Sequence, residues 1–237
     1  MMRAAVLEEI GKLRLKQVPV PEPGPGEVLV RIEANTICGT DLRIISGAKT
    51  AGVRPGVILG HEFAGRVAAV GRGVDGVPVG AQVTCSIVVS CQRCRACLSG
   101  REQLCENLVL FGYELDGGLA EYLLVPKIAM DHGNLVVLEK EIPATTLALA
   151  EPVSCCLNGA GQVAVAPGES VVVLGTGPIG LLHIALAKLA GATTILAAGR
   201  EGRLAAATDF GATCAVALTG EALTAEVRER TNGRGAD

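Results

Sequence analysis

A glycine-rich turn between an apolar strand and an apolar helix limits most strongly what this chain can fold into. The run Ser170–Leu174 is rich in valine, as in a buried strand, and Ile179–Ala190 follows it with the spacing of an apolar helix. A second short apolar run, Thr193–Ala197, comes next. A strand, a helix and a strand within about 30 residues predict a βαβ unit, which implies a parallel sheet covered by helices.

The turn itself has the spacing of a dinucleotide-binding loop, Gly-x-Gly-x-x-Gly. In a strand–turn–helix context the glycines allow the backbone to approach a pyrophosphate, which lies at the helix N-terminus. A plain tight turn in another α/β fold is the alternative. We expect the cofactor-binding residues of this turn to be Gly175, Gly177, Pro178, Ile179 and Gly180.

The residues that follow the second predicted strand bear on which cofactor is used. A dinucleotide fold that binds NAD carries an acidic residue about 20 residues beyond the glycine turn, where it binds the ribose 2′-hydroxyl. Here that place holds Ala197, Ala198, Gly199 and Arg200, without a carboxylate. Small residues beside a guanidinium suit a 2′-phosphate, so Gly199 and Arg200 predict a preference for NADP over NAD. The alternative is that Arg200 is a surface residue and Glu201 takes the role of the acid.

The chain of 237 residues changes character once. Alternating runs such as Val28–Ala34 and Phe63–Val70 predict β-structure in the N-terminal part, whereas Ala144–Val165 is rich in alanine and leucine at helical spacing. We therefore predict a β-rich domain over residues 1–152 and a doubly wound α/β domain over residues 153–237, which is unfinished where the sequence stops.

Composition excludes several classes of partner and location. A net charge of −3 offers no basic surface for nucleic acid or an anionic membrane. The longest apolar stretch, Val171–Ala187, is broken by glycine and proline and is shorter than a membrane-spanning helix requires. The N-terminus lacks the apolar segment of a signal peptide. We expect a cytoplasmic protein, in which the nine cysteines serve a purpose other than disulfides.

Four of the nine cysteines, Cys91, Cys94, Cys97 and Cys105, lie within fifteen residues. Their short spacings bring four thiolates within reach of one tetrahedral ion, and a site whose positions are all filled by sulfur is structural. The polar residues between them argue against simple burial. We predict a structural zinc in a lobe over about residues 85–110, with an iron–sulfur cluster or free buried cysteines as the alternatives.

A second group of zinc-ligand residue types lies in the same β-rich region. Cys38 opens the run Cys-Gly-Thr-Asp, and His61 and Glu62 follow Gly60. Ligands that come from separate segments and leave a coordination position open are typical of a catalytic zinc. Glu151 at the start of the last predicted helix before the glycine turn adds a carboxylate, although an acid also favours a helix N-terminus for its own sake.

Together these motifs, in this order, resemble the zinc-containing medium-chain dehydrogenases over essentially the whole chain, most closely the sorbitol and threonine dehydrogenase branch. The resemblance implies a GroES-like β-rich catalytic domain joined to a Rossmann domain, an α/β fold class. It also implies that Cys38, His61 and Glu62 are catalytic zinc ligands, and that Glu151 ligates zinc directly or through water. The choice of third ligand between Glu62 and Glu151 stays open.

The same resemblance implies a zinc-dependent oxidoreductase that transfers a hydride between a secondary alcohol, a polyol or amino alcohol, and NAD(P). It would carry two zinc ions per chain, one catalytic and one structural, and form a homodimer or homotetramer. Cys38 and His61 would hold the catalytic zinc, and Thr40 would pass the alcohol proton away. A zinc-free quinone or enoyl reductase and a non-enzymatic, zinc-stabilised nucleotide-binding module are the alternatives.

Two features depart from the family pattern. Arg43 stands where many relatives carry a histidine that passes the proton to solvent, and a guanidinium does not release its proton at working pH. The proton therefore needs another route, from Thr40 to water or to the cofactor ribose. The sequence also stops where a further strand is expected, which predicts a member truncated at its C-terminus. The sequence names neither the alcohol nor the oligomeric state.

Overall fold

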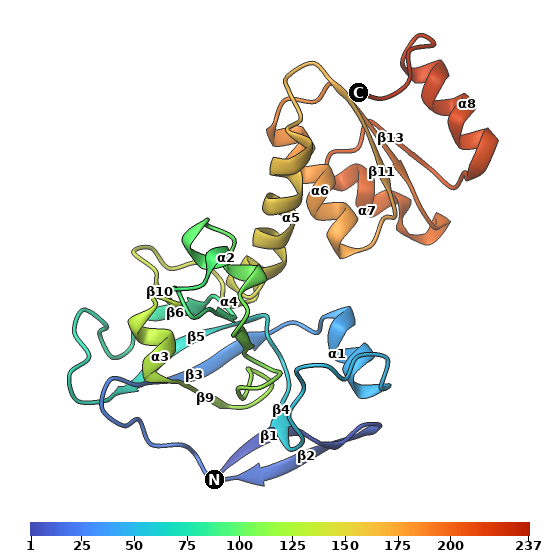
Figure 1. Ribbon diagram of the computed structural model, residues 1–237. Helices are drawn as coiled ribbons and strands as arrows, with labels where there is room; N and C mark the ends of the chain where they lie inside the picture. The colour runs from blue at the N-terminus through green and yellow to red at the C-terminus, as the bar shows by residue number, and fades with distance from the viewer. The chain divides into compact units, whose positions relative to one another are not determined.

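The structure is a computed structural model and describes residues 1–237. It divides into two compact units, Met1–Glu151 and Pro152–Asp237, shown in Figure 1. Each unit has sheets and apolar clusters of its own. We call them the first unit and the second unit.

The first unit is built on a five-stranded antiparallel sheet in the order β10-β6-β5-β3-β9. Irregular register between β3 and β5 twists this sheet. Alternate residues of β3, among them Val28 and Val30, face a core that also contains Phe63 and Phe111. The strands of this sheet are β3 (Val28–Asn35), β5 (Phe63–Val70), β6 (Gln82–Cys85), β9 (Tyr122–Val125) and β10 (Leu135–Val137).

A smaller sheet in the order β2-β1-β4 packs with helix α1, which follows Cys38. Leu7 of β1, Ile44 of α1 and Leu59 are buried in one cluster, which also contains Tyr113. This packing fixes the position of α1. The elements are β1 (Met2–Glu9), β2 (Lys12–Val18), β4 (Val57–Ile58) and α1 (Gly39–Ile45). Two further helices of the first unit are α3 (Lys127–Asp131) and α4 (Ala144–Leu147).

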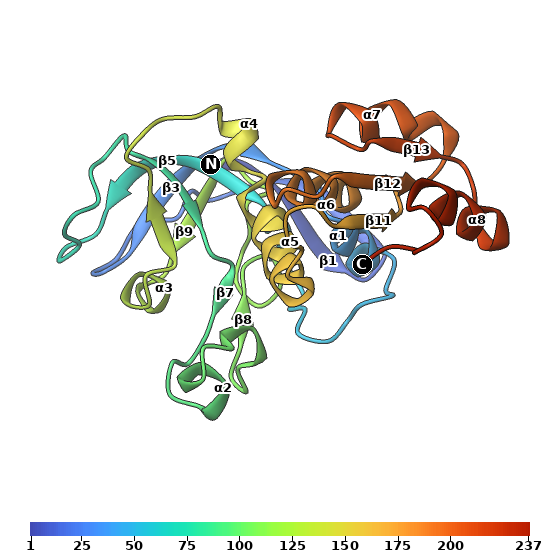
Figure 2. The same cartoon turned by 90° about the horizontal axis from the view of Figure 1, so that it is seen from above.

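The four-cysteine segment forms a lobe in the first unit. Figure 2 shows the lobe extending away from β3, β5 and β9. Its base is the short antiparallel pair of β7 and β8, and its outer part is a single turn of helix and a 3₁₀ turn. The elements are β7 (Val88–Val89), α2 (Arg95–Leu98), η1 (Glu102–Leu104) and β8 (Val109–Leu110).

The second unit contains a parallel sheet in the order β11-β12-β13, as the βαβ pattern predicts. Ile184 of α6 and Ile195 of β12 are fully buried between the helices and the sheet. The elements are α5 (Ala150–Val163), β11 (Ser170–Leu174), α6 (Pro178–Leu189), β12 (Thr194–Ala198), η2 (Glu201–Arg203), α7 (Leu204–Asp209), β13 (Cys214–Val216) and α8 (Gly220–Arg230).

The predicted helical segment 144–165 contains two helices, α4 and α5, instead of one. Pro152 causes the break, because it has no N–H to donate to the carbonyl of Ala148 and its ring would clash with that carbonyl. The helix restarts at Ala150, which places Pro152 in the first turn, where a proline is tolerated.

The apolar stretch Val171–Ala187 is shared between a strand and a helix, with the glycine turn between them. No helix in the structure combines the length and the apolar character that crossing a bilayer demands.

Phe111 is a test of the core of the first unit. It is fully buried, and its ring contacts Phe63 edge to face at 6.1 Å between centroids. We expect Phe111→Ala to destabilise the first unit by about 3–5 kcal/mol, because the substitution leaves a cavity. The matched variant Leu15→Ala removes a side chain that is 74% exposed and should cost less than about 0.5 kcal/mol.

Urea unfolding followed by tyrosine fluorescence measures this difference. Both tyrosines, Tyr113 and Tyr122, lie in the first unit and the chain has no tryptophan, so the signal reports on that unit alone. Equal unfolding midpoints for the two variants would contradict the assignment of Phe111 to the core.

Candidate functional site

Cys38 is placed by the start of α1. It is the N-cap residue in an extended conformation, its side chain accepts the backbone N–H of Asp41, and its own N–H donates to Asp41 Oδ2 at 2.9 Å. These reciprocal bonds are those of a capping box, with cysteine in the place of serine or threonine. The bonds therefore hold both the backbone and the sulfur of Cys38 at the helix start.

His61 and Glu62 are placed by the glycine before them. Gly60 has φ of +95°, and a Cβ on Gly117 would lie 2.0 Å from the Gly60 carbonyl oxygen. Because glycines stand at both places, the two backbones pack against each other and Gly118 N donates to Gly60 O at 2.9 Å. This packing carries His61 and Glu62 into the interior, where they are 3% and 7% exposed.

The structure brings Cys38, His61 and Glu62 together. One potential ligand atom of each lies within 4.8 Å of those of the other two. The group joins a thiol, an imidazole and a carboxylate, which are the three ligand types that zinc takes in proteins. The donor set therefore fits a zinc ion with an open position.

Asp41 supports two of these three residues, and the sequence analysis gave it no role. Its carboxylate is 1% exposed, with Oδ2 on the Cys38 N–H and Oδ1 at 3.4 Å from His61 Nδ1. Burial lowers the pKa of His61, but the Asp41 carboxylate and the Cys38 sulfur outweigh it and raise that pKa to about 9. Ligation requires the neutral ring, so a metal ion binds here in competition with a proton.

Glu62 is oriented by a second neighbour. The Thr36 hydroxyl donates to Glu62 Oε2 through a short hydrogen bond, and Thr36 N donates to the Glu62 carbonyl at 2.8 Å. Glu151 lies in the first turn of α5, and its charge contributes to the raised pKa of Tyr113. Glu62 thus stands with Cys38 and His61 as a donor, and Glu151 stays a candidate for the same zinc.

Thr40 and Tyr113 lie beside this group. Burial raises the pKa of the Tyr113 phenol to about 12, helped by the charges of Cys38 and Asp41, while a hydrogen bond with Thr40 acts in the opposite direction. The Tyr113 ring lies 5.4 Å from that of His61 between centroids. Arg43, one helical turn after Thr40, is exposed in the last turn of α1.

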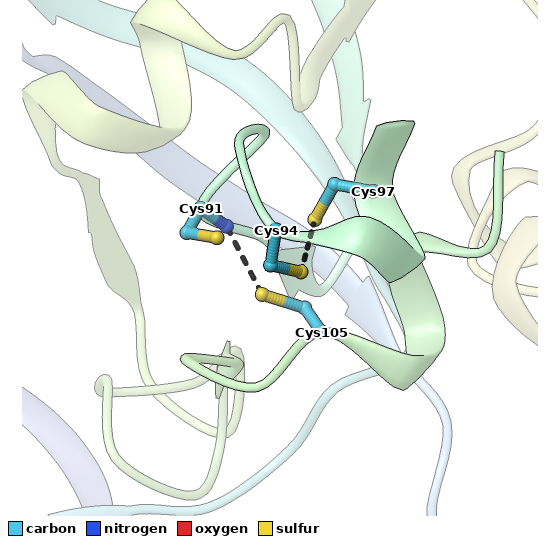
Figure 3. Close-up of side chains that lie close together, drawn as sticks. All are labelled: Cys91, Cys94, Cys97 and Cys105. Carbon is cyan, nitrogen blue, oxygen red and sulfur yellow. Dashed lines mark hydrogen bonds between the residues drawn. The ribbon is translucent and has the colours of Figure 1, made fainter. Parts of the chain in front are cut away.

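The four cysteines of the lobe converge on one point. Their sulfurs lie within 4.8 Å of one another, and Figure 3 shows all four pointing into a shared space. Four ligands at about 2.3 Å from one zinc ion lie about 3.8 Å from one another, which this cluster accommodates. All four are free thiols, two of them buried.

Backbone N–H groups around the lobe favour the thiolate form that a metal needs. The N–H groups of Arg93 and Cys94 lower the pKa of Cys91 to about 6, and that of Cys97 lowers the pKa of Cys94. Cys105 Sγ accepts from Cys91 N at 3.2 Å. Burial instead raises the pKa of Cys97 to about 11, which a bound cation would reverse. These sulfurs thus fit a structural zinc.

The glycine turn of the second unit has the close packing that its spacing predicts. Gly175 has φ of +105°, and a Cβ on Gly180 would lie 1.8 Å from the Gly175 carbonyl oxygen. Gly177 is the N-cap of α6 and Pro178 its first residue. Ile179, the next residue of the helix, is 49% exposed. The turn thus leaves the start of α6 open to a bound group.

Gly199 and Arg200 lie at the carboxyl end of β12, beside this turn. Both line a cavity of about 460 Å³ with Gly175, and the start of α8 borders it through Thr219 and Leu223. A Cβ on Gly199 would lie 2.0 Å from Thr176 Oγ1, so glycine is required there. The cavity is lined by apolar residues and one guanidinium, which fits a nucleoside with an anionic group.

Comparison with known proteins agrees with both regions. The model of the alcohol dehydrogenase GroES-like domain matches residues 24–134, and that of the zinc-binding dehydrogenases matches residues 178–237. The chain is 35% identical to alcohol dehydrogenase TADH from Thermus sp. ATN1, whose structure superposes with a TM-score of 0.87 over 100% of this chain and 69% of that one. The chain belongs to the zinc-containing medium-chain dehydrogenase family.

Membership in this family confirms the predicted fold class, a GroES-like β-rich part followed by a Rossmann-like nucleotide-binding part. Other similar medium-chain dehydrogenases include an L-threonine 3-dehydrogenase of Pyrococcus furiosus, 40% identical over 228 residues, which are 94% of this chain and 63% of the relative. A candidate zinc-binding dehydrogenase from Sinorhizobium meliloti 1021, solved bound to NADP, is 40% identical with a TM-score of 0.85, over 91% of this chain and 61% of that one. The chain therefore spans less than two thirds of the length of these relatives.

Asp41 gives the first test of the site. We expect Asp41→Asn to weaken zinc binding by the Cys38, His61 and Glu62 group about 10- to 100-fold. The reason is that a carboxylate beside a zinc-binding histidine orients the ring and raises its basicity. Competition with a chromophoric chelator measures this affinity. The zinc of this site is identified as the ion that the His61→Ala variant also loses. Asp75→Asn, which changes an exposed aspartate, is the matched control. Unchanged affinity in Asp41→Asn would remove this role from Asp41.

Proposed function

We propose that this chain is a zinc-dependent oxidoreductase that transfers a hydride between a secondary alcohol and NAD(P). One observation carries the proposal: three donors suited to an open zinc site converge in a chain that also has a dinucleotide turn. In this proposal residues 1–152 form the catalytic domain and residues 153–237 the dinucleotide-binding domain.

Cys38, His61 and Glu62 hold the catalytic zinc in this proposal. When bound there, zinc supplies a Lewis acid that lowers the pKa of an alcohol hydroxyl toward neutrality. The residues of the chain hold the ion and orient its ligands: Asp41 and Thr36 fix the donors, and burial keeps His61 and Glu62 away from bulk water. Glu151 remains a candidate for a ligand that acts through water.

Thr40 takes the alcohol proton in this mechanism, and the Tyr113 contact supports it. A hydroxyl that both accepts and donates can pass a proton onward, and a hydrogen bond links Thr40 to Tyr113, whose ring contacts that of His61. Arg43 is exposed and permanently charged, so the onward route leads from Thr40 to water or to the cofactor ribose. The dinucleotide, when bound, supplies the hydride acceptor.

The four-cysteine lobe holds a second, structural zinc in this proposal. Its sulfurs fill every position of a tetrahedral ion, which leaves none for a substrate. The protein then carries two zinc ions per chain. An iron–sulfur cluster is the alternative for the same sulfurs, and its visible absorption would distinguish it from colourless zinc.

The substrate is a small-molecule alcohol, and the chemistry of the similar proteins supports this. They include the threonine dehydrogenase of Pyrococcus furiosus and, at 30% identity with a TM-score of 0.85, a galactitol-1-phosphate dehydrogenase from Escherichia coli, compared over 96% of this chain and 65% of that one. We propose a polyol or an amino alcohol as substrate, and a homodimer or homotetramer as the assembly. The alternatives are a non-enzymatic zinc-stabilised nucleotide-binding module and a zinc-free quinone or enoyl reductase.

His61→Ala tests the catalytic role of the zinc donors. We expect the variant to lose turnover of secondary alcohols while dinucleotide affinity is unchanged, because the dinucleotide turn lies in the other unit. Steady-state assays with zinc and both cofactors measure the first effect, and dinucleotide titration measures the second. His132→Ala, outside the donor group, should keep turnover. Wild-type turnover in His61→Ala would refute the zinc mechanism.

We infer that NADP is preferred over NAD. Arg200 lines the cavity beside the glycine turn, and neither Ala198 nor Gly199 brings a carboxylate that would repel a 2′-phosphate. Arg203 follows one turn later. Its guanidinium would lie 3.5 Å from a Cβ added at Gly177, so a second positive charge borders the turn. The Sinorhizobium structure with NADP bound supports this choice.

Arg200→Ala should weaken NADP binding about ten- to a hundredfold, because a charge-assisted hydrogen bond contributes about 1.5–3 kcal/mol. Affinity for NAD should change little, since NAD has no 2′-phosphate. Titration with each dinucleotide measures both, and Arg228→Ala, an exposed arginine on α8, is the control. A wild-type preference for NAD, or an equal loss for both cofactors, would overturn the assignment.

A further inference from the structure

Lys49 is a cation that lies against Tyr113, a neighbour of the zinc donors, and it has no part in the proposed hydride transfer. It lies in the connection between α1 and β4, and its ammonium is 5.2 Å from the centroid of the Tyr113 ring. It donates one hydrogen bond, to the Ala51 carbonyl at 3.0 Å. An ammonium has three donors, so Lys49 keeps capacity for a further acceptor.

Tyr113 connects this ammonium to the zinc donors. Its ring contacts Lys49 and also the ring of His61, at 5.4 Å between centroids. Tyr113 is only 6% exposed, and the cluster that contains Leu7 and Ile44 holds it in place. The position of Lys49 relative to His61 is therefore fixed by a packed ring, and a single aromatic side chain separates the cation from a zinc donor.

The charges around the ring explain what a cation does there. The acidic side chains of Glu62 and Asp41 and the thiol of Cys38 gather on the side of the ring that meets His61. An acidic group of this kind disfavours an anionic substrate unless a cation lies nearby. Lys49 takes part in none of the ion pairs of the structure. The carboxylate of Glu114, which lies against Gly52 in the same loop as Lys49, accepts a hydrogen bond from the N–H of Leu110 and is not paired with Lys49.

We propose that Lys49 binds an anionic group, carboxylate or phosphate, on the alcohol substrate and so selects charged alcohols over neutral ones. This inference rests on the proposed dehydrogenase function of the same site. The ammonium supplies a charge-assisted hydrogen bond to the anion. Lys49 is thus a specificity residue, and it takes no part in the hydride or proton transfer.

Matched alcohols that differ only in the anion test this proposal. The carboxylate pair is 3-hydroxybutyrate and 3-hydroxybutyramide, and the phosphate pair is 2-hydroxypropyl phosphate and 1,2-propanediol. Dissociation constants are measured by calorimetry on the zinc-loaded protein without dinucleotide, so the readout does not depend on turnover. Lys49→Met removes the charge, Lys49→Arg retains it, and Lys140→Met, an exposed lysine elsewhere in the first unit, is the control.

We expect the wild-type protein to bind at least one anionic alcohol more tightly than its neutral partner. Lys49→Met should weaken that binding about ten- to a hundredfold, the range of one charge-assisted hydrogen bond, and leave the neutral partner unchanged. Lys49→Arg should restore most of the preference. The pair that responds identifies the anion as carboxylate or phosphate.

Equal binding of anionic and neutral partners by the wild-type protein, or equal losses in Lys49→Met, would overturn the role of Lys49. Turnover of the neutral alcohols with zinc and NADP separates this failure from that of the proposed function. If neutral alcohols are oxidised without any preference for anions, only the role of Lys49 fails. If no alcohol of either pair is oxidised, the dehydrogenase proposal fails and the role of Lys49 fails with it.

Discussion

The buried carboxylate of Asp41 is the interaction on which the candidate zinc site depends. Cys38 and His61 come from segments more than twenty residues apart, and Asp41 contacts both, one through its backbone N–H and the other through its ring. A carboxylate that is 1% exposed is costly to bury unless it is bonded on its oxygens. Asp41 lies between the two donors, with Oδ2 bonded to the Cys38 N–H and Oδ1 3.4 Å from His61 Nδ1, and the glycine packing at Gly60 brings Glu62 in with His61.

The structural features that the sequence predicts correctly are those formed by residues close together in the chain. The glycine turn, its strand and its helix lie within about 20 residues, and the structure has them where the valine run and the spacing of the glycines predict. The four lobe cysteines likewise lie close together, and their sulfurs converge as expected. The family comparisons confirm the fold class that these two motifs imply.

The remaining features depend on contacts between distant segments, and sequence patterns do not encode those. Tyr113 and Lys49 meet only because β4 and the loop after β8 pack around α1, and neither residue belongs to a motif. The grouping of Glu62 with Cys38 and His61 is of the same kind, because only the fold places these three residues together. The break between α4 and α5 was foreseeable from Pro152, but the helical spacing of the flanking residues obscured it.

The zinc content of the purified protein tests the central claim most directly, that two donor groups of different chemistry each hold one ion. The measurement is elemental analysis after loading with zinc and removal of unbound metal by gel filtration. We predict two zinc ions per chain, of which His61→Ala loses one and Cys94→Ser loses the other. A single zinc, held by the lobe alone, would match a nucleotide-binding module, and no zinc would match a zinc-free reductase. Either result would contradict the account.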